Sequence, residues 1–395
     1  MTENLSDRIN SLSTSQTLAM AAMARELKAQ GKDIISLSLG EPDFTTPDFI
    51  KEAAKKAIDE NYSTYTPVDG YVELREAISR KFKRDNNLDY KPSQIVVSTG
   101  AKQSLFNIAN VLLNPGDECI LPAPFWVSYS EIVKMCGATP IEVPTTVDSD
   151  FKMTPEQFEA AITPKTKMML FSSPCNPSGS VYNREELEAL AKVLEKYPNI
   201  IVVSDEIYEH INFTNSFCSM ASIPGMYDRT VTVNGVSKAF AMTGWRIGYI
   251  GAPEYIAKAC TKMQGQITSG ANSIAQRATI AAVDADPSVL KYMVDEFHKR
   301  RDIVIKMICE IPNIKMNTPE GAFYVFPDVS SFFGKTLRGQ TINNADDFSM
   351  YLLSEACVAT VTGEAFGNPN CIRISYAAAE DKLIEAITRI KEVLC

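Results

Sequence analysis

The chain has 395 residues, of which 45% are hydrophobic and 22% are charged, and its formal net charge is −9. This length exceeds what one hydrophobic core usually organises, so we expect two domains or one large domain with an appendage. The acidic balance argues against nucleic acid or an anionic membrane as the main partner, although a few focused cations can still bind small anions.

The cysteines and histidines indicate the redox compartment of the protein and which metal and disulfide sites are expected. The nine cysteines are an odd number without a C-x-x-C pair, which disfavours a disulfide scaffold or a zinc site and favours a reducing cytoplasm. His210 and His298 lack metal-ligand spacing, so we expect no metal. We also expect no secretory signal and no membrane span, because no apolar run reaches about 18 residues.

From about residue 94 to residue 250, short apolar runs alternate with helical patterns. Strands are expected at 94–98, 119–121, 168–172, 200–204 and 230–234, and helices at 101–113 and from Asn183, a predicted N-cap, onward. Runs that are apolar on both faces and separated by helices predict an α/β protein with a buried, mostly parallel sheet.

Beyond about residue 285 the pattern changes. A long charged helix is expected over 288–311, followed by the apolar run 320–326 and a strand at 371–375. We therefore predict a large domain at 45–285 and a smaller α+β domain at 286–395. The N-terminal segment 1–44 is expected to contribute to the smaller domain.

Polar residues follow several of the expected strands at the points where the strands end. They lie at 98–100, 173–176, Asp205 and 234–238. In open α/β sheets, ligands bind at the carboxyl ends of the strands. The sequence therefore predicts one site at this edge of the sheet.

Lys238, Asp205 and Arg246 together suit an aldehyde cofactor. A cofactor such as pyridoxal 5′-phosphate needs an amine to form an imine, an anion for its ring nitrogen and a cation for its phosphate. A carboxylate about 4 Å from that nitrogen supplies roughly 4 kcal/mol, about three pKa units, which suffices to hold its proton. Taken singly, Asp205 reads as a turn cap and Arg246 as a surface residue.

Other residues near these strand ends complete the predicted site. The helix that starts at Gly100 offers free N–H groups to a phosphate, and Tyr208 and Asn176 can bond the phenolic oxygen of the cofactor. Arg373 can clamp a substrate α-carboxylate through two parallel hydrogen bonds. Trp126 can stack on the cofactor ring, although ordinary core packing explains it equally well.

Across nearly its whole length the chain resembles the fold-type I, class I pyridoxal-phosphate aminotransferases, most closely the bacterial aspartate aminotransferase branch. The resemblance is carried by residues 38–44, 65–67, 74–78, 124–129, 173–179, 204–209 and, most strongly, 237–248. Cys175 and Ser178 depart from the residues common in this branch without a predicted change in chemistry.

The resemblance implies a role for each matching residue. The implied catalytic residues are Lys238, Asp205 and Tyr208. The same three residues would contact the cofactor, together with Gly100, Ala101, Lys102, Trp126, Asn176, Ser237 and Arg246. The substrate would be contacted by Gly40, Trp126, Asn176 and Arg373. Tyr65 would reach the cofactor phosphate of a second subunit, which implies a homodimer with active sites at the subunit interface.

The implied reaction is a ping-pong transfer of the amino group of L-aspartate to 2-oxoglutarate. Lys102, with Ser15 and Thr17, resembles the donor set that this branch uses for aspartate, and residues 269–272 are expected nearby across the dimer. Prephenate or aromatic amino acids are alternative substrates. A carbon–sulfur lyase on the same fold and a non-catalytic ligand sensor are the competing functions.

Overall fold

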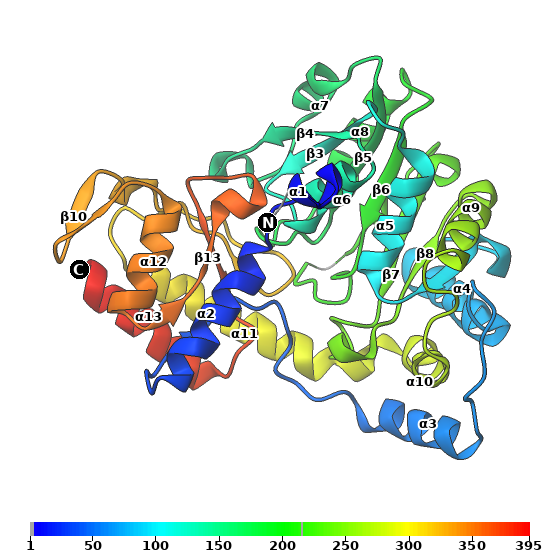
Figure 1. The fold of residues 1–395 in the computed structure, drawn as a ribbon, viewed down its shortest axis with the longest axis horizontal. Coiled ribbons are helices and arrows are strands. Elements are labelled where there is room, and N and C mark those ends of the chain that lie inside the picture. The colour runs from blue at the N-terminus through cyan, green and yellow to red at the C-terminus, as the bar shows by residue number, and fades with distance from the viewer. Residues whose placement is uncertain (1–3, 215) are drawn as a thin grey trace.

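The computed structural model describes residues 4–214 and 216–395 and is built around a seven-stranded sheet (Figure 1). In sheet order the strands are β2 (Ile95–Ser98), β8 (Gly248–Gly251), β7 (Thr230–Gly235), β6 (Ile201–Asp205), β5 (Thr166–Ser172), β3 (Glu118–Ala123) and β4 (Thr139–Pro144). Only β8 runs antiparallel to its neighbours, and every other pairing is parallel. The predicted α/β fold with a mostly parallel sheet is therefore confirmed.

Helices cover both faces of this sheet because its strands are apolar on both sides. Ile95 and Val97 pack into one core, and Val96 between them packs into the opposite core. One face carries α5 (Ala101–Leu112), α6 (Ser128–Met135) and α9 (Glu254–Gly265). The other carries α4 (Val72–Asn86), α10 (Ser273–Asp284), α8 (Arg184–Leu194) and α7 (Pro155–Ala161), with α3 (Asp48–Asp59) packed on α10.

A smaller three-stranded antiparallel sheet lies beside the main one. It contains β13 (Val361–Thr362), β14 (Ile372–Ser375) and β9 (Tyr324–Val325). Helices α11 (Lys291–Ile308), α12 (Ala345–Glu355) and α13 (Glu380–Leu394) accompany it. Strands β10 (Lys335–Leu337) and β11 (Gln340–Ile342) form a separate hairpin beside α12 (Figure 1).

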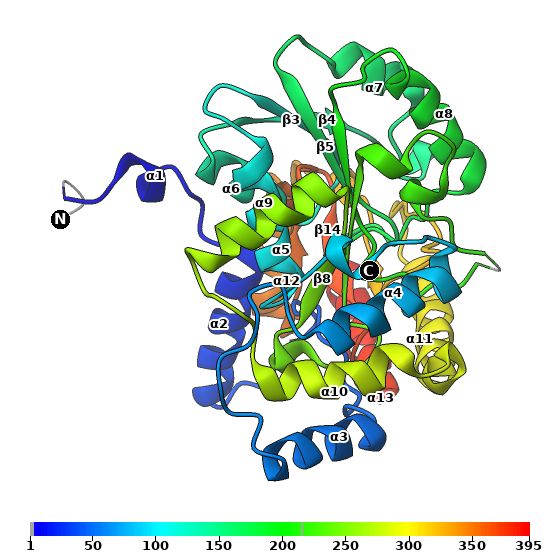
Figure 2. The ribbon, with the colours of Figure 1, turned by 90° about the vertical axis from the view of Figure 1, so that its right-hand side faces the viewer.

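The N-terminal segment packs against this C-terminal part of the chain. Strand β1 (Ile35–Ser36) pairs in parallel with β12 (Val358–Ala359), and α2 (Gln16–Ala29) contacts β12 and β13. The short helix α1 (Asp7–Asn10) has no buried residue and projects away from the rest of the molecule (Figure 2). Among the helices of the described ranges, none combines the length and apolarity that crossing a bilayer requires.

Two strands of the main sheet were not among those expected from the sequence. Strand β4 is an edge strand with prolines at 140 and 144, and β8 begins and ends with glycine, so both lack the usual strand composition. The N-cap prediction at Asn183 is confirmed, because its side chain accepts a hydrogen bond from the Glu186 amide at 2.9 Å. The charged helix starts at Lys291, after a 3₁₀ turn over Pro287–Leu290.

Candidate active site

A cavity of about 260 Å³ lies at the carboxyl ends of the central strands, between the two sheets. Most of the predicted site residues line it: Gly40, Ala101, Lys102, Trp126, Asn176, Asp205, Tyr208, Ser237, Lys238, Arg246 and Arg373. The structure therefore brings together side chains from segments that are far apart in sequence, at the sheet edge where ligands of α/β proteins bind.

The amine of Lys238 faces this cavity from the loop that follows β7. Its Nζ donates a hydrogen bond to the carbonyl oxygen of Gly40 at 2.6 Å. Burial, together with the positive charges of Arg373 and Arg246, lowers the pKa of Lys238 to about 8. A substantial fraction of the amine is therefore neutral near physiological pH, as a nucleophile requires.

Asp205 ends strand β6 and points its carboxylate into the cavity. Its Oδ2 accepts a hydrogen bond from the hydroxyl of Tyr129 at 2.7 Å, and its Oδ1 accepts one from the Ile207 amide at 3.2 Å. Burial raises the pKa of Asp205 to about 6, although these bonds and Lys238 oppose the rise. In the sequence, only its place in the 124–129 motif pointed to Tyr129, and no role was predicted for it.

Tyr208 reaches the cavity from the turn after β6, and its hydroxyl lies 2.8 Å from the hydroxyl of Tyr324. Tyr324 belongs to β9 of the smaller sheet and was also given no role from the sequence. Its hydroxyl lies so close to Gly40 that a Cβ there would be 1.9 Å away, so only glycine fits at position 40. This contact explains why a glycine precedes the Glu41–Pro42 pair.

Arg373 is 2% exposed and extends from β14 toward the same cavity. Its Nη1 donates to Oδ1 of Asn176 at 2.9 Å, and its Nη2 donates to the carbonyl oxygen of Ser38 at 2.5 Å. Its Nε is buried without a hydrogen-bond partner in the described residues. A buried guanidinium that is paired only with neutral acceptors can bind a carboxylate from the substrate.

Two further cations, Arg246 and Lys102, line the cavity near the start of helix α5. Helix α5 begins directly after Gly100, and Arg246 lies against that glycine, since a Cβ at position 100 would be 2.2 Å from its Nη2. Burial and repulsion from Arg246 lower the pKa of Lys102. Within residues 4–214 and 216–395, neither cation forms an ion pair, so this part of the cavity can bind an anion such as a phosphate.

The remaining predicted residues take different positions. Trp126 lines the cavity, and the Lys102 ammonium lies 4.8 Å from the centre of its ring. Ser15 and Thr17 also line the cavity from the N-terminal segment. Tyr65 is 99% exposed and stays outside the cavity of its own chain, as do residues 269–272.

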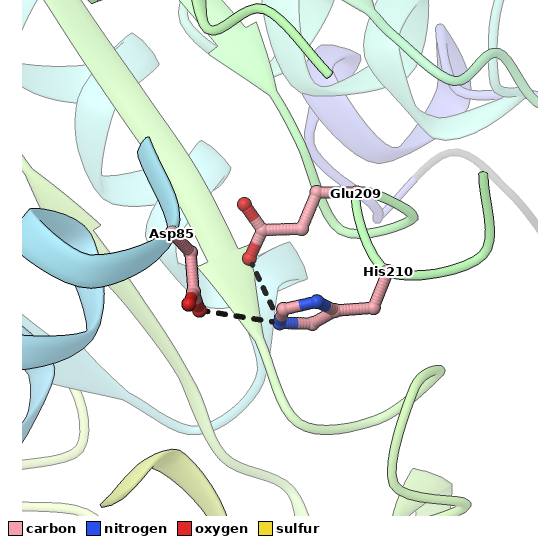
Figure 3. A group of neighbouring side chains, drawn as sticks. All are labelled: Asp85, Glu209 and His210. Carbon is pink, nitrogen blue, oxygen red and sulfur yellow. Dashed lines mark ion pairs between the residues drawn. The ribbon is translucent and has the colours of Figure 1, made fainter. Parts of the chain in front are cut away.

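A cluster of charged side chains joins α4 to the turn that carries Tyr208 (Figure 3). Glu209 is buried in it, and Asp85 and His210 are partly buried. Asp85, Glu209 and His210 present ligand-type atoms within 4.8 Å of one another. The Lys81 ammonium, however, forms an ion pair with Glu209 and donates to Asn86 at 2.8 Å. Lys81 therefore supplies the positive charge that balances Glu209.

The side chains in the cavity fit pyridoxal 5′-phosphate. This cofactor needs an amine with a lowered pKa, a buried carboxylate and a helix end that binds anions. Lys238, Asp205 and the start of α5 provide these three features. Within the part of the chain that the structure describes, the Nε of Arg373 has no hydrogen-bond partner and Lys102 forms no ion pair, so both can bind further negative groups.

The chain matches known proteins over almost its full length. Residues 32–390 match the family model for aminotransferase class I and II. An aspartate/prephenate aminotransferase of Cereibacter sphaeroides is 49% identical over 390 residues, covering 98% of each chain. The bifunctional aspartate aminotransferase and glutamate/aspartate-prephenate aminotransferase of Petunia hybrida is 48% identical over 396 residues, covering 99% of this chain and 83% of the relative.

Solved structures agree with these matches. The aspartate aminotransferase of Rhizobium meliloti superposes with a TM-score of 0.96 at 44% identity, covering 98% of both chains. That of Thermus thermophilus, solved with maleate, superposes with a TM-score of 0.92 at 39% identity, covering 99% of this chain and 100% of the other. The fold, the cavity and these similarities lead to one conclusion: the chain belongs to the aminotransferase class I and II family, and it is a fold-type I aminotransferase that uses pyridoxal 5′-phosphate.

Proposed function

We propose that this protein transfers the amino group of L-aspartate to 2-oxoglutarate, giving oxaloacetate and L-glutamate in a ping-pong reaction. The observation that carries the proposal is one cavity lined by Lys238, Asp205 and Arg373. The charges of Asp205 and Arg373 both act on the Lys238 amine. Such a cavity can hold an aldehyde cofactor and a carboxylate substrate next to one amine.

In this proposal the chain's own residues divide the work. Pyridoxal 5′-phosphate, when bound, supplies an electron sink for the electron pair left when the substrate loses its α-proton. Lys238 holds the cofactor covalently and, once displaced, moves the proton from the substrate α-carbon. Asp205 keeps the ring nitrogen protonated, and Tyr208 and Asn176 bond the ring oxygen.

The phosphate and the ring need further contacts. We assign the phosphate to Arg246, Ser237 and the backbone N–H groups of Gly100, Ala101 and Lys102 at the helix start, which leaves the Lys102 ammonium for the substrate. Trp126 would stack on the cofactor ring.

The choice of aspartate rests on a second set of donors at the far end of the substrate. Arg373 binds the α-carboxylate, and Lys102, Ser15 and Thr17 bind the side-chain carboxylate in this proposal. All four residues line the cavity. Two further observations support it: relatives are named for aspartate, and the Thermus thermophilus structure was solved with maleate, itself a dicarboxylate.

Prephenate is the alternative amino acceptor. The Cereibacter sphaeroides and Petunia hybrida relatives carry prephenate in their names beside aspartate. A carbon–sulfur lyase would instead release pyruvate and ammonia from a cysteine conjugate.

We further propose a homodimer in which Tyr65 of each subunit reaches the cofactor phosphate of the other. Its side chain is 99% exposed, and Leu5, Ile9 and Leu18 of the N-terminal segment are exposed apolar residues that a second subunit would cover. The domain limits 45–285 and 286–395, with 1–44 joining the smaller unit, belong to the same proposal. Nine free cysteines suit a reducing cytoplasm.

The test combines a substrate survey with one variant. The loaded protein, given aspartate and 2-oxoglutarate, is expected to form glutamate and oxaloacetate, and assays with prephenate, aromatic amino acids and a cysteine conjugate rank the alternatives. Lys238→Ala is expected to lose both turnover and the visible absorbance of the covalent Lys238–cofactor linkage. Substantial transamination by Lys238→Ala would count decisively against the assignment.

A further inference from the structure

The hydroxyl of Tyr324 lies where the two sheets meet at the cavity, and it has no role in the proposed function. Tyr324 is 1% exposed and comes from β9 of the smaller sheet, whereas its hydrogen-bond partner Tyr208 follows β6 of the main sheet. The two hydroxyls are 2.8 Å apart. This bond therefore links the two sheets directly at the cavity.

The ring and the hydroxyl of Tyr324 have separate surroundings. The ring packs against the Arg373 guanidinium, 4.6 Å from its centre, and against Phe323 at 4.9 Å. The hydroxyl faces Tyr208 and fills the space above Gly40, whose carbonyl holds Lys238. Removing the hydroxyl alone would leave the packing on Arg373 intact.

Two hydroxyls in contact must divide the roles of donor and acceptor. If Tyr208 donates its proton to the ring oxygen of the cofactor, as proposed above, only Tyr324 can donate within the pair. Burial raises the pKa of both hydroxyls and the Arg373 cation opposes the rise in both, so the direction within the pair rests on the bond from Tyr208 to the cofactor. A hydroxyl that accepts one hydrogen bond becomes a stronger donor in the next.

We propose that Tyr324 is a positioning residue that donates its hydroxyl proton to Tyr208 and thereby directs and strengthens the bond from Tyr208 to the cofactor. The inference rests on the proposed function, because it requires Tyr208 to contact the ring oxygen. It adds a residue whose effect is exerted through Tyr208 and not through the substrate.

The test compares the pH midpoint of the visible absorption spectrum in the loaded protein and in Tyr324→Phe, Tyr208→Phe and the double variant. A weaker bond to the negatively charged ring oxygen makes the Lys238–cofactor linkage hold its proton to higher pH. The midpoint is therefore expected to rise by about half a pH unit in Tyr324→Phe, on the scale of one neutral hydrogen bond. Tyr208→Phe is expected to give a larger rise.

The double variant decides whether Tyr324 acts through Tyr208. If it does, Tyr208→Phe/Tyr324→Phe has the same midpoint as Tyr208→Phe alone. In Tyr324→Phe, kcat is expected to fall while KM for aspartate stays within about twofold, since the ring still supports Arg373.

Tyr90→Phe is the matched control. It removes another buried hydroxyl, which bonds Thr232 at 3.1 Å outside the cavity, and is expected to lower the melting temperature without moving the midpoint. An unchanged midpoint in Tyr324→Phe, or additive shifts in the double variant, would overturn the inference while leaving the proposed function intact. A parent protein that binds no cofactor would overturn both.

Discussion

Burial sets the chemistry of the two central residues, Lys238 and Asp205. It moves their pKa values toward neutrality from opposite sides, to about 8 for the lysine and to about 6 for the aspartate. The same desolvation lowers the free energy of unfolding of the ligand-free protein, because the charged form of each group is less stable inside the cavity than in water. The site is therefore a place where function opposes stability.

Asp205→Asn is expected to stabilise the cofactor-free protein at pH 7.5 while abolishing most transamination. The folded-state pKa of Asp205, about 6, is raised above its ordinary value of 3.8, so the native state binds more protons between these values and stability falls as pH rises through them. Asparagine removes this cost, a gain on the order of 1–3 kcal/mol at pH 7.5 and none at pH 4.

Urea unfolding of both proteins at the two pH values measures this effect. The exposed residue Asp228 provides the control, since Asp228→Asn is expected to change stability little at either pH. Lys238 does not interfere, because its lowered pKa affects stability only between about 8 and 10.5, where stability rises with pH. A destabilised Asp205→Asn at pH 7.5 would contradict this account.

Arg373→Lys is expected to raise KM for aspartate and 2-oxoglutarate by roughly 10-fold or more, with a smaller change in kcat. Lysine keeps the charge but cannot bond Asn176, Ser38 and a carboxylate in one plane, so about one charge-assisted hydrogen bond is lost. Steady-state kinetics measure the change. Arg300→Lys, at another buried arginine outside the cavity, should leave both KM values unchanged.

At the scale of elements, the turn after β6 is held from behind by α4. Lys81 and Asn86 both come from that helix, and Asn86 donates to Oε2 of Glu209 at 2.7 Å. Although burial opposes it, Lys81 lowers the pKa of Glu209 to about 2, so the carboxylate stays charged. Tyr208 is the residue before Glu209, and the cluster thus fixes the backbone from which Tyr208 reaches the cavity.

Lys81→Met is expected to destabilise the protein by about 3–5 kcal/mol, because it leaves the Glu209 carboxylate buried without its cation. The double variant Lys81→Met/Glu209→Gln should be less destabilised than the sum of the two single variants. Urea unfolding of the cofactor-free proteins gives the three free energies. Strict additivity would mean that the pair is not a coupled unit.

At the scale of the whole molecule, the cavity is closed by segments from both sheets and from the N-terminal part of the chain. Gly40 and Ser15 come from that N-terminal part, Asp205 and Lys238 from the main sheet, and Arg373 from the smaller one. A movement of the smaller sheet relative to the main sheet would change the distance between Arg373 and Lys238. The cavity is therefore complete only when these three parts of the chain are packed together.

Subunit complementation tests the proposed homodimer. Lys238→Ala and Tyr65→Ala are each expected to have little activity alone. In a mixed dimer, one site combines Lys238 of one chain with Tyr65 of the other, so mixing the variants under mild dissociation and reassociation should restore activity. The assay follows glutamate formation against unmixed controls. No gain on mixing, with mixed dimers verified by mass spectrometry, would argue against a shared site.

The sequence alone determined which polar residues meet in the cavity, while their catalytic roles stay predictions. Lys238, Asp205 and Arg246 stand just past strand ends or in short motifs, and the strands themselves are apolar runs long enough to recognise, so local pattern sufficed. The same logic failed for β4 and β8, whose prolines and glycines are tolerated only because of where those strands lie in the sheet.

The tertiary structure decided the pKa values and the hydrogen-bond partners of those residues. The hydrogen bonds between Tyr129 and Asp205 and between Tyr208 and Tyr324 join positions 76 and 116 residues apart, and the Lys81–Glu209 pair joins α4 to the turn after β6. No local pattern encodes such partners, because hydrogen bonding and burial depend on which distant segments the fold places together. The sequence gives the chemical identity of each group. Its pKa and its hydrogen-bond partners are set only when folding buries it beside distant segments and removes the surrounding water.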